Sequence, residues 1–107
     1  MTDIQIDETI DIKIDEEIKK ELDEPPKYKV VLLNDDSTPI EFVIQILREL
    51  FKHSIAGAEQ LTMTIHNEGS GIAGVYTYEI AEQKAIESVN LSRANGFPLQ
   101  IKVEEDL

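Results

Sequence analysis

The sequence predicts an α+β protein in which a small, mostly antiparallel three-stranded sheet packs against three helices. From Lys27 onward, segments with strand or helix signals follow one another in the order strand, helix, helix, strand, helix, strand. Before them, Pro25 and Pro26 mark a boundary, because proline donates no backbone hydrogen bond and restricts the residue before it. We therefore divide the chain into a flexible acidic N-terminal extension, residues 1–26, and a folded domain, residues 27–107.

The N-terminal extension differs from the rest of the chain in charge. Residues 1–24 hold ten acidic residues against three lysines, a net charge of −7. The isoleucines from Ile10 to Ile14 are spaced by two, as in a strand, but Asp and Glu crowd both sides and no turn folds the segment back on a partner. We expect a disordered tail. A surface helix over residues 15–23 is the alternative.

The first strand and helix of the domain have clear local signals. The β-branched and apolar run Tyr28–Leu33 predicts a buried strand, and the turn formers of residues 34–37 end it. Thr38 as a cap, Pro39 at the first helical position and Glu41 three residues past the cap predict a helix to about residue 51. The side chains with helical spacing on its expected core face are Phe42, Ile46, Leu47, Leu50 and Phe51.

The remaining elements follow in order. Ser54 is expected to cap a second helix that ends near Gly69. The run Gly71–Tyr76 predicts the second strand. A third helix is expected to begin at a capping Thr77 and to end at an Asn-Gly pair, and the last strand is Leu99–Val103.

Composition excludes several classes of function. The 107-residue chain has a net charge of −12, which would repel nucleic acid and anionic lipid, so we expect neither as a partner. It has no cysteine, which rules out thiol catalysis and thiolate metal sites within the chain. No apolar run is long enough to cross a bilayer, and no secretory signal is visible, which favours a cytoplasmic protein.

The run Asn34-Asp35-Asp36 between a strand and a helix is the candidate site. It can be an ordinary turn, a site for a hard cation, or a set of oxygen acceptors for an ammonium group. The residue spacing of a calcium loop is absent. His66, near the end of the second helix, gives weak support to the ammonium site, whereas His53 is expected to be an ordinary loop residue.

An enzyme finds little support in the sequence. A hydrolase built on Asp35 and His66 would need a nucleophile, and no Gly-x-Ser-x-Gly motif or cysteine supplies one. The stretch Gly69-Ser70-Gly71 lacks the Lys-Ser/Thr pair of a phosphate loop and is expected to be a turn. We expect a binding protein without a cofactor or a metal ion.

Specific motifs resemble the ClpS family, the adaptors of the ATP-dependent Clp protease. The resemblance covers about residues 25–104, nearly the whole predicted domain. It is carried by Pro25-Pro26, Tyr28 to Asp36, Thr38-Pro39, Glu41-Phe42-Val43, Gln60-Leu61, Ile65-His66, Gly69, Gly74-Val75, Thr77, Glu79, Ala81-Glu82, Lys84, Arg93 and Pro98-Leu99.

The resemblance implies a function. Family members recognise N-end rule substrates, proteins whose first residue is Phe, Tyr, Trp or Leu, and deliver them to the ClpA unfoldase of ClpAP. It implies that Asn34, Asp35 and His66 hold the substrate's α-amino group, and that Glu79 and Lys84 dock on ClpA. The residues that would line the side-chain pocket are Leu32, Thr38, Ile40, Val43, Thr62, Ile65 and Leu99. The acidic tail would be engaged by the unfoldase during delivery.

Two positions depart from the family pattern. Ile40 occupies a gatekeeping position often filled by Met, where bulk excludes β-branched first residues. Thr62 replaces a larger apolar side chain, so a smaller, partly polar wall could admit a bulkier ring or weaken Leu binding. We expect aromatic first residues to remain ligands.

The main alternative to an adaptor is a non-adaptor interaction domain with the similar small α+β fold of the ribosomal stalk protein.

Overall fold

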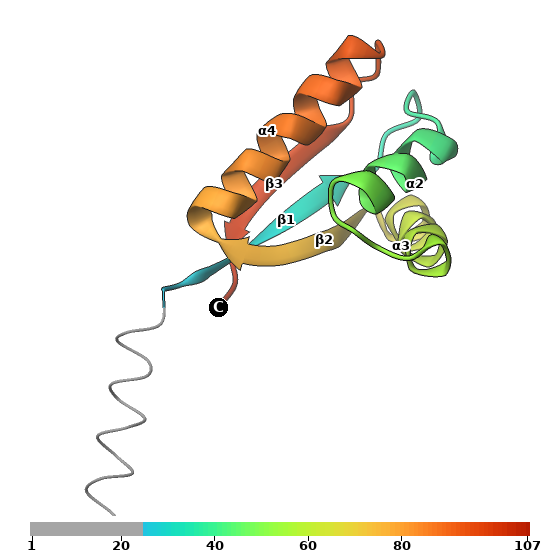
Figure 1. Ribbon diagram of the computed structural model, residues 1–107. Helices are drawn as coiled ribbons and strands as arrows, with labels where there is room; N and C mark the ends of the chain where they lie inside the picture. The colour runs from blue at the N-terminus through green and yellow to red at the C-terminus, as the bar shows by residue number, and fades with distance from the viewer. Residues whose placement is uncertain (1–24) are drawn as a thin grey trace, which may run out of the picture.

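The structure, a computed structural model, describes residues 25–107 and contains three helices and three strands in that part of the chain (Figure 1). The strands are β1 (Lys27–Leu33), β2 (Ser70–Thr77) and β3 (Gln100–Glu105). The helices are α2 (Ile40–Glu49), α3 (Ile55–Glu68) and α4 (Tyr78–Ala94). The order β-α-α-β-α-β confirms the predicted fold class. The predicted disordered tail and its helical alternative lie outside the described residues.

Strand β1 is the centre of the antiparallel sheet, whose order is β2-β1-β3. Val30 lies opposite Val103 of β3 and Gly74 of β2, but Val31 lies opposite Ile72, so Ala73 is an extra residue in β2. This β-bulge lets β2 keep its pairing with β1 while one residue is left outside the ladder.

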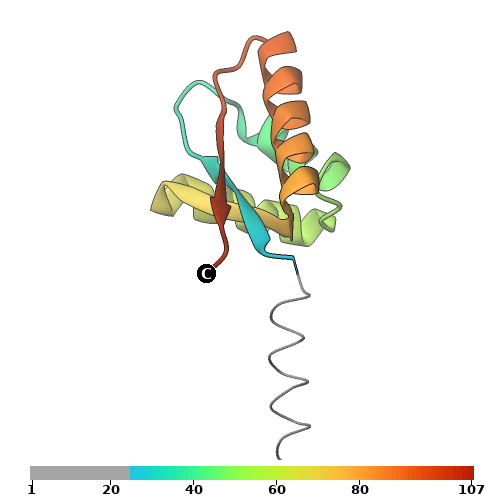
Figure 2. The same ribbon diagram turned by 90° about the vertical axis from the view of Figure 1, so that its left-hand side faces the viewer.

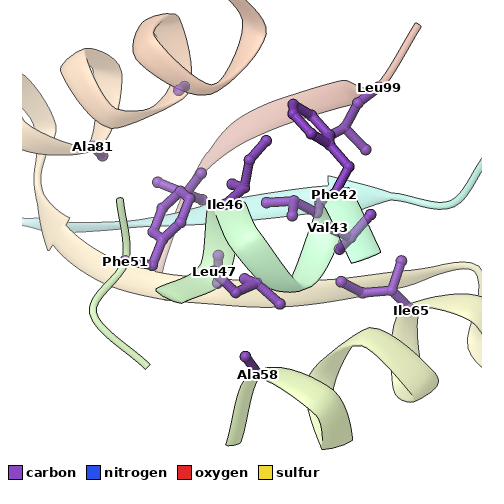
Figure 3. Close-up of a cluster of buried hydrophobic side chains, with 13 residues drawn as sticks. Phe42, Val43, Ile46, Leu47, Phe51, Ala58, Ile65, Ala81 and Leu99 are labelled. Carbon is purple, nitrogen blue, oxygen red and sulfur yellow. The ribbon is translucent and has the colours of Figure 1, made fainter. Parts of the chain in front are cut away.

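Within residues 25–107, one hydrophobic core joins the sheet to α2, α3 and α4 (Figure 3). Val30 and Leu32 of β1 are fully buried, as expected for alternate residues that point to the same face of a strand. The helices add apolar side chains, so all three cover this face of the sheet. The buried residues of the cluster are Val30, Leu32, Phe42, Val43, Ile46, Leu47, Phe51, Ala58, Ile65, Ala73, Ala81, Ala85 and Leu99.

The helix ends confirm some predicted caps and correct others. Ser54 caps α3 by accepting a hydrogen bond from the backbone N–H of Gly57 at 3.0 Å, and Gly69 ends α3 in the left-handed conformation with φ 94°. The prediction that Thr38 caps α2 is wrong, because Pro39 occupies the cap position. The Thr38 hydroxyl donates to the carboxylate of Asp35. Thr77 stands at the start of α4 but forms no side-chain cap.

The two ends of the domain lie together. The backbone N–H of Asp106 donates to the carbonyl oxygen of Lys27 at 2.8 Å, and the C-terminus lies beside the start of β1 in both views (Figures 1 and 2). The other end of β1, where the chain turns into α2, is about 20 Å away, since seven residues of strand rise roughly 3.3 Å each. Within residues 25–107, no helix combines the length and apolar character needed to span a membrane.

Candidate functional site

A cavity of about 290 Å³ opens where β1 ends, between the following turn, α2, α3 and the start of β3. Its floor is buried and its rim is exposed, so a bound group could enter from solvent. A volume near 300 Å³ is at the small end of the range for ligand sites and suits one large side chain. The lining residues are Leu33, Asn34, Asp35, Asp36, Thr38, Pro39, Ile40, Val43, Thr62, Ile65, His66 and Leu99.

The Asp35 carboxylate organises the turn at the rim. Its Oδ1 atom accepts hydrogen bonds from the backbone N–H groups of Ser37 and Thr38, both at 2.8 Å. Its Oδ2 atom accepts the hydroxyl of Thr38 at 2.7 Å. Asp35 therefore fixes the geometry of the loop and also keeps a negative charge at the cavity rim.

The turn is tied to the end of α3. The backbone N–H of Asn34 donates to the carbonyl oxygen of Gly69 at 2.9 Å, just beyond the last turn of α3, which carries His66. The structure thus brings Asn34, Asp35 and His66, separated by up to 32 positions in the chain, to one cavity. Their proposed contact with a ligand amine stays a prediction.

Asp36 also lines the cavity, although the family resemblance places only Asn34, Asp35 and His66 at the ligand amine. It is exposed, and its carboxylate forms no hydrogen bond or ion pair with any residue in the range 25–107. The sequence offered one signal, the adjacent pair of aspartates. Only the folded backbone shows which of the two aspartates accepts the hydrogen bonds that hold the turn.

The interior of the cavity is apolar. Val43, Ile65 and Leu99 are buried, whereas Ile40 is 42% exposed at the first turn of α2 and stands at the rim. Thr62 is 3% exposed, and its hydroxyl donates to the carbonyl oxygen of Ala58 at 2.7 Å. The partly polar wall expected at Thr62 therefore has its only donor engaged inside the helix.

Leu32 lies outside the cavity, contrary to the expected pocket set. It is fully buried among the core residues, because alternate residues of β1 point toward the helices. Its neighbour Leu33, half-buried at the end of β1, lines the cavity in its place. The other expected pocket residues, Thr38, Ile40, Val43, Thr62, Ile65 and Leu99, all line the cavity.

The two expected docking residues of α4 lie in different environments. Glu79 is exposed in the first turn of the helix. Lys84 is half-buried, and its Nζ atom donates to the carbonyl oxygen of Leu50 at 2.7 Å. Neither residue lines the cavity.

His53 is not the ordinary loop residue that the sequence suggested. Its Nε2 atom lies 2.6 Å from the carbonyl oxygen of Ala73, the extra residue of the β2 bulge. Because a carbonyl oxygen can only accept, Nε2 carries the proton of this hydrogen bond. The ring thus joins the segment before α3 to β2.

The cavity combines a site for a cation at its opening with a site for an apolar group at its floor. Two carboxylates, an amide and an imidazole surround its opening, and aliphatic side chains form its floor. Across the described range 25–107, no group of three or more His, Cys, Asp or Glu side chains is placed to hold a metal ion. The arrangement is complementary to a ligand that joins an ammonium group to a large apolar group.

These features define the chain as a small α+β ligand-binding domain. The model of the family described as "ATP-dependent Clp protease adaptor protein ClpS" matches residues 23–102. The chain belongs to the ClpS family of Clp protease adaptors. This membership favours the adaptor over the ribosomal-stalk-like interaction domain.

Individual relatives agree with the family match. The chain is 48% identical over 83 residues to the ATP-dependent Clp protease adapter protein ClpS of Campylobacter jejuni subsp. jejuni serotype O:23/36, which covers 78% of this chain and 86% of that protein. It is 49% identical over 81 residues to ClpS of Burkholderia thailandensis, covering 76% and 78% respectively. The structure of Agrobacterium tumefaciens ClpS2 bound to L-phenylalaninamide is similar, with a TM-score of 0.75 and 42% identity over 78% of this chain and all of that one.

Proposed function

We propose that this chain is an N-end rule adaptor of the bacterial cytoplasm. It binds proteins with a free, large hydrophobic first residue (Phe, Tyr, Trp or Leu) and delivers them to the ClpA unfoldase of the ClpAP protease. The observation that carries the proposal is the apolar cavity with an acidic rim. The Agrobacterium ClpS2 structure supports it, because L-phenylalaninamide joins a free α-amino group to one apolar ring.

The rim would hold the ligand's α-amino group. With an unperturbed pKa of about 7.7–8.0, this group is mostly cationic at pH 7. Asn34 and Asp35 offer oxygen acceptors, and His66 faces the same space from α3. The Asp36 carboxylate adds a second negative charge at the rim. Hydrogen bonds to charged groups contribute about 1.5–3 kcal/mol each.

The cavity would hold the first side chain. Burying a Leu or Phe side chain contributes about 1.5–3 kcal/mol, and the buried Val43, Ile65 and Leu99 provide the apolar surroundings. Ile40 at the rim is β-branched and stiff at χ1, so first residues that are themselves β-branched would meet its methyl groups.

Specificity follows from the need for both contacts. After the costs of ordering, the two together give an affinity in the micromolar range, about −8 kcal/mol. Neither contact suffices alone, so internal Phe residues and acetylated N-termini are rejected. The adaptor itself performs no cleavage, and catalysis belongs to the protease.

Delivery would use surfaces away from the cavity. The exposed Glu79 of α4, the nearby Lys84 and the acidic tail are the parts that we assign to ClpA. The cavity lies at the opposite end of β1 from Lys27, the first residue of that strand.

The test is a titration with a fluorescent peptide that begins with Phe, and with the same peptide acetylated at its N-terminus. We expect saturable binding of the free peptide only, and no cleavage of either. Asn34→Ala should weaken binding about tenfold, the loss of one charge-assisted hydrogen bond. Asn90→Ala, an exposed position on α4, is the matched control. Equal binding of the acetylated peptide would refute the amine site, and cleavage would indicate an enzyme.

A further inference from the structure

The connection between α2 and α3 is short and held from two sides. Helix α2 ends at Glu49 with Leu50 as its C-cap, and α3 begins at Ile55. Between them, Lys52 has a φ of 61°, a left-handed conformation that is uncommon for residues other than glycine. The backbone N–H of His53 donates back to the carbonyl oxygen of Leu47 at 3.0 Å. The chain therefore reverses here in one defined geometry.

Lys84 of α4 holds the first side of this connection. Its Nζ atom donates to the carbonyl oxygen of Leu50 at 2.7 Å, where the C-terminal end of α2 leaves carbonyl groups without helical partners. The ammonium group also lies 5.4 Å from the ring centroid of Tyr76 and 5.9 Å from that of Phe51. A cation at a helix C-terminus and over aromatic rings is favourable on both counts.

His53 holds the second side. Its imidazole donates to the carbonyl oxygen of Ala73 at the β2 bulge, 2.6 Å away. The α2–α3 connection is thus attached by one side chain to α4 and by another to β2. Because both acceptors are main-chain carbonyl groups, these bonds fix the backbone path rather than a surface side chain.

The two helices joined here both line the ligand cavity. Helix α2 contributes Ile40 and Val43, and α3 contributes Thr62, Ile65 and His66. The distance along α2 from Ile40 to Leu50 is about 15 Å, at 1.5 Å per residue. If α2 moves as a rigid body, a change in its direction at Leu50 displaces Ile40 at the cavity.

From this arrangement we infer that Lys84 is a positioning residue for the ligand cavity, through its hydrogen bond to Leu50. The ligand readout of this inference rests on the proposed function. A partner that engages the Lys84 ammonium on α4 would compete with Leu50 and alter the cavity. By thermodynamic linkage, ligand binding would then alter the affinity for that partner by the same factor.

The test uses Lys84→Met, which keeps an apolar side chain and removes the hydrogen-bond donor. Lys102→Met on β3 is the matched control, because Lys102 is exposed and lies outside the α2–α3 connection. We expect Lys84→Met to weaken a Phe-initiated peptide by about two- to thirty-fold, the range of 0.5–2 kcal/mol for coupling mutations, and to change the ratio of Phe to Leu affinity. Lys84→Arg should restore both. A purely structural role predicts a lower Tm with unchanged affinity and ratio in the folded variant, and that result would overturn the inference.

A ligand-free measurement keeps the inference separate from the proposed function. In amide NMR spectra, Lys84→Met should shift the resonances of residues 40–43 as well as those near the substitution, and Lys84→Arg should not. If wild-type protein bound no Phe-initiated peptide, the proposed function would fail, and the shift pattern would still decide the role of Lys84. Shifts confined to residues 47–53 and 81–88 would reject it. Should Lys84→Met not fold, Lys84→Gln receives the same measurements.

Discussion

The hydroxyl of Thr62 donates to the carbonyl oxygen of Ala58, one turn earlier in α3 and 2.7 Å away. Thr62 lines the ligand cavity but is almost completely buried, so its position in the wall is fixed by packing and by this bond. Compared with the larger apolar side chain of the family pattern, Thr62 therefore changes the size of the cavity more than its polarity.

We predict that Thr62→Val keeps the affinity for a Phe-initiated peptide within about twofold, because Val has the same shape and the lost hydrogen bond lies within the helix. Thr62→Met should instead fill the cavity and weaken peptides that begin with Trp by about 1–3 kcal/mol, as overpacking does in protein interiors. Fluorescence anisotropy with Phe, Trp and Leu peptides would measure both effects. A tenfold loss in Thr62→Val would show that the hydroxyl contacts the ligand.

The charge of Asp35 can be separated from its role in the turn. Asp35→Asn keeps an oxygen acceptor for the backbone N–H groups of Ser37 and Thr38 but removes the negative charge. We expect about a tenfold loss of affinity for a free-amine peptide, since one charge-assisted contact is worth about 1.5–3 kcal/mol. The Tm should fall less than in Asp35→Ala, because only the acceptor for the Thr38 hydroxyl is lost. Asp35→Ala should lose affinity and also stability, because it removes all three acceptor contacts.

Asp36→Asn is the matched comparison, since Asp36 makes no contact that holds the turn. A smaller loss than in Asp35→Asn is expected if Asp35 is the principal carboxylate for the amine. If Asp35→Asn bound normally and Asp36→Asn did not, the amine contact would belong to Asp36. Isothermal titration calorimetry at one ionic strength would decide between them.

The order of the elements was predictable because its signals are local. The Ser54 cap and the Gly69 stop depend on a few neighbouring residues, and both were confirmed. The Thr38 cap was wrong because the folded turn, held by Asp35 through the backbone N–H groups of Ser37 and Thr38, starts α2 one residue later, with Pro39 at the cap position. Local sequence signals do not set the exact residue at which this turn ends and the helix begins.

The residues that line the cavity were less predictable, because tertiary contacts determine which side chains face it. The expected pocket set contained Leu32, but strand alternation buries it in the core and leaves Leu33 at the cavity. The sequence also contained no sign that Lys84, expected to dock on ClpA, donates a hydrogen bond to the carbonyl oxygen of Leu50, 34 positions away in the chain. Nothing in the sequence pattern signals such a bond between a side chain and a distant main-chain group.

Ligand affinity should depend on the ionisation of the ligand's own amine. We predict that binding of a Phe-initiated peptide weakens as the pH rises above about 8, the unperturbed pKa of an α-amino group. The acidic rim favours the protonated amine, which raises its pKa in the complex, so the loss begins at the pKa of the free peptide. Titrations between about pH 6.5 and 9.5 would measure it. A pH-independent affinity would contradict a charged amine contact.

Burial raises the pKa of Tyr76 above its usual value of 10.0. Because the folded-state pKa is the higher one, the contribution of Tyr76 to stability is complete below pH 10 and is lost as the pH rises through the folded-state pKa. Tyr76→Phe keeps the ring beside Lys84 and removes the ionisable group, so its Tm should fall less between about pH 9 and 11 than that of the wild type. An identical fall in both proteins would show that other groups control alkaline unfolding.

Removing residues 1–24 should separate binding from delivery. The remaining residues, 25–107, contain every strand and helix described here, the complete core and the whole cavity. The truncation point lies next to the start of β1, about 20 Å along the strand from the cavity, so we expect the affinity for a Phe-initiated peptide to change by less than about twofold. Degradation of a Phe-initiated reporter by ClpAP should become much slower, because we assign the tail to the unfoldase.

The control for this truncation replaces residues 1–24 by a Gly-Ser segment of equal length, which distinguishes the need for this sequence from the need for any extension. Delivery by the truncated protein at the wild-type rate would remove the tail from the mechanism and leave the peptide site unaffected.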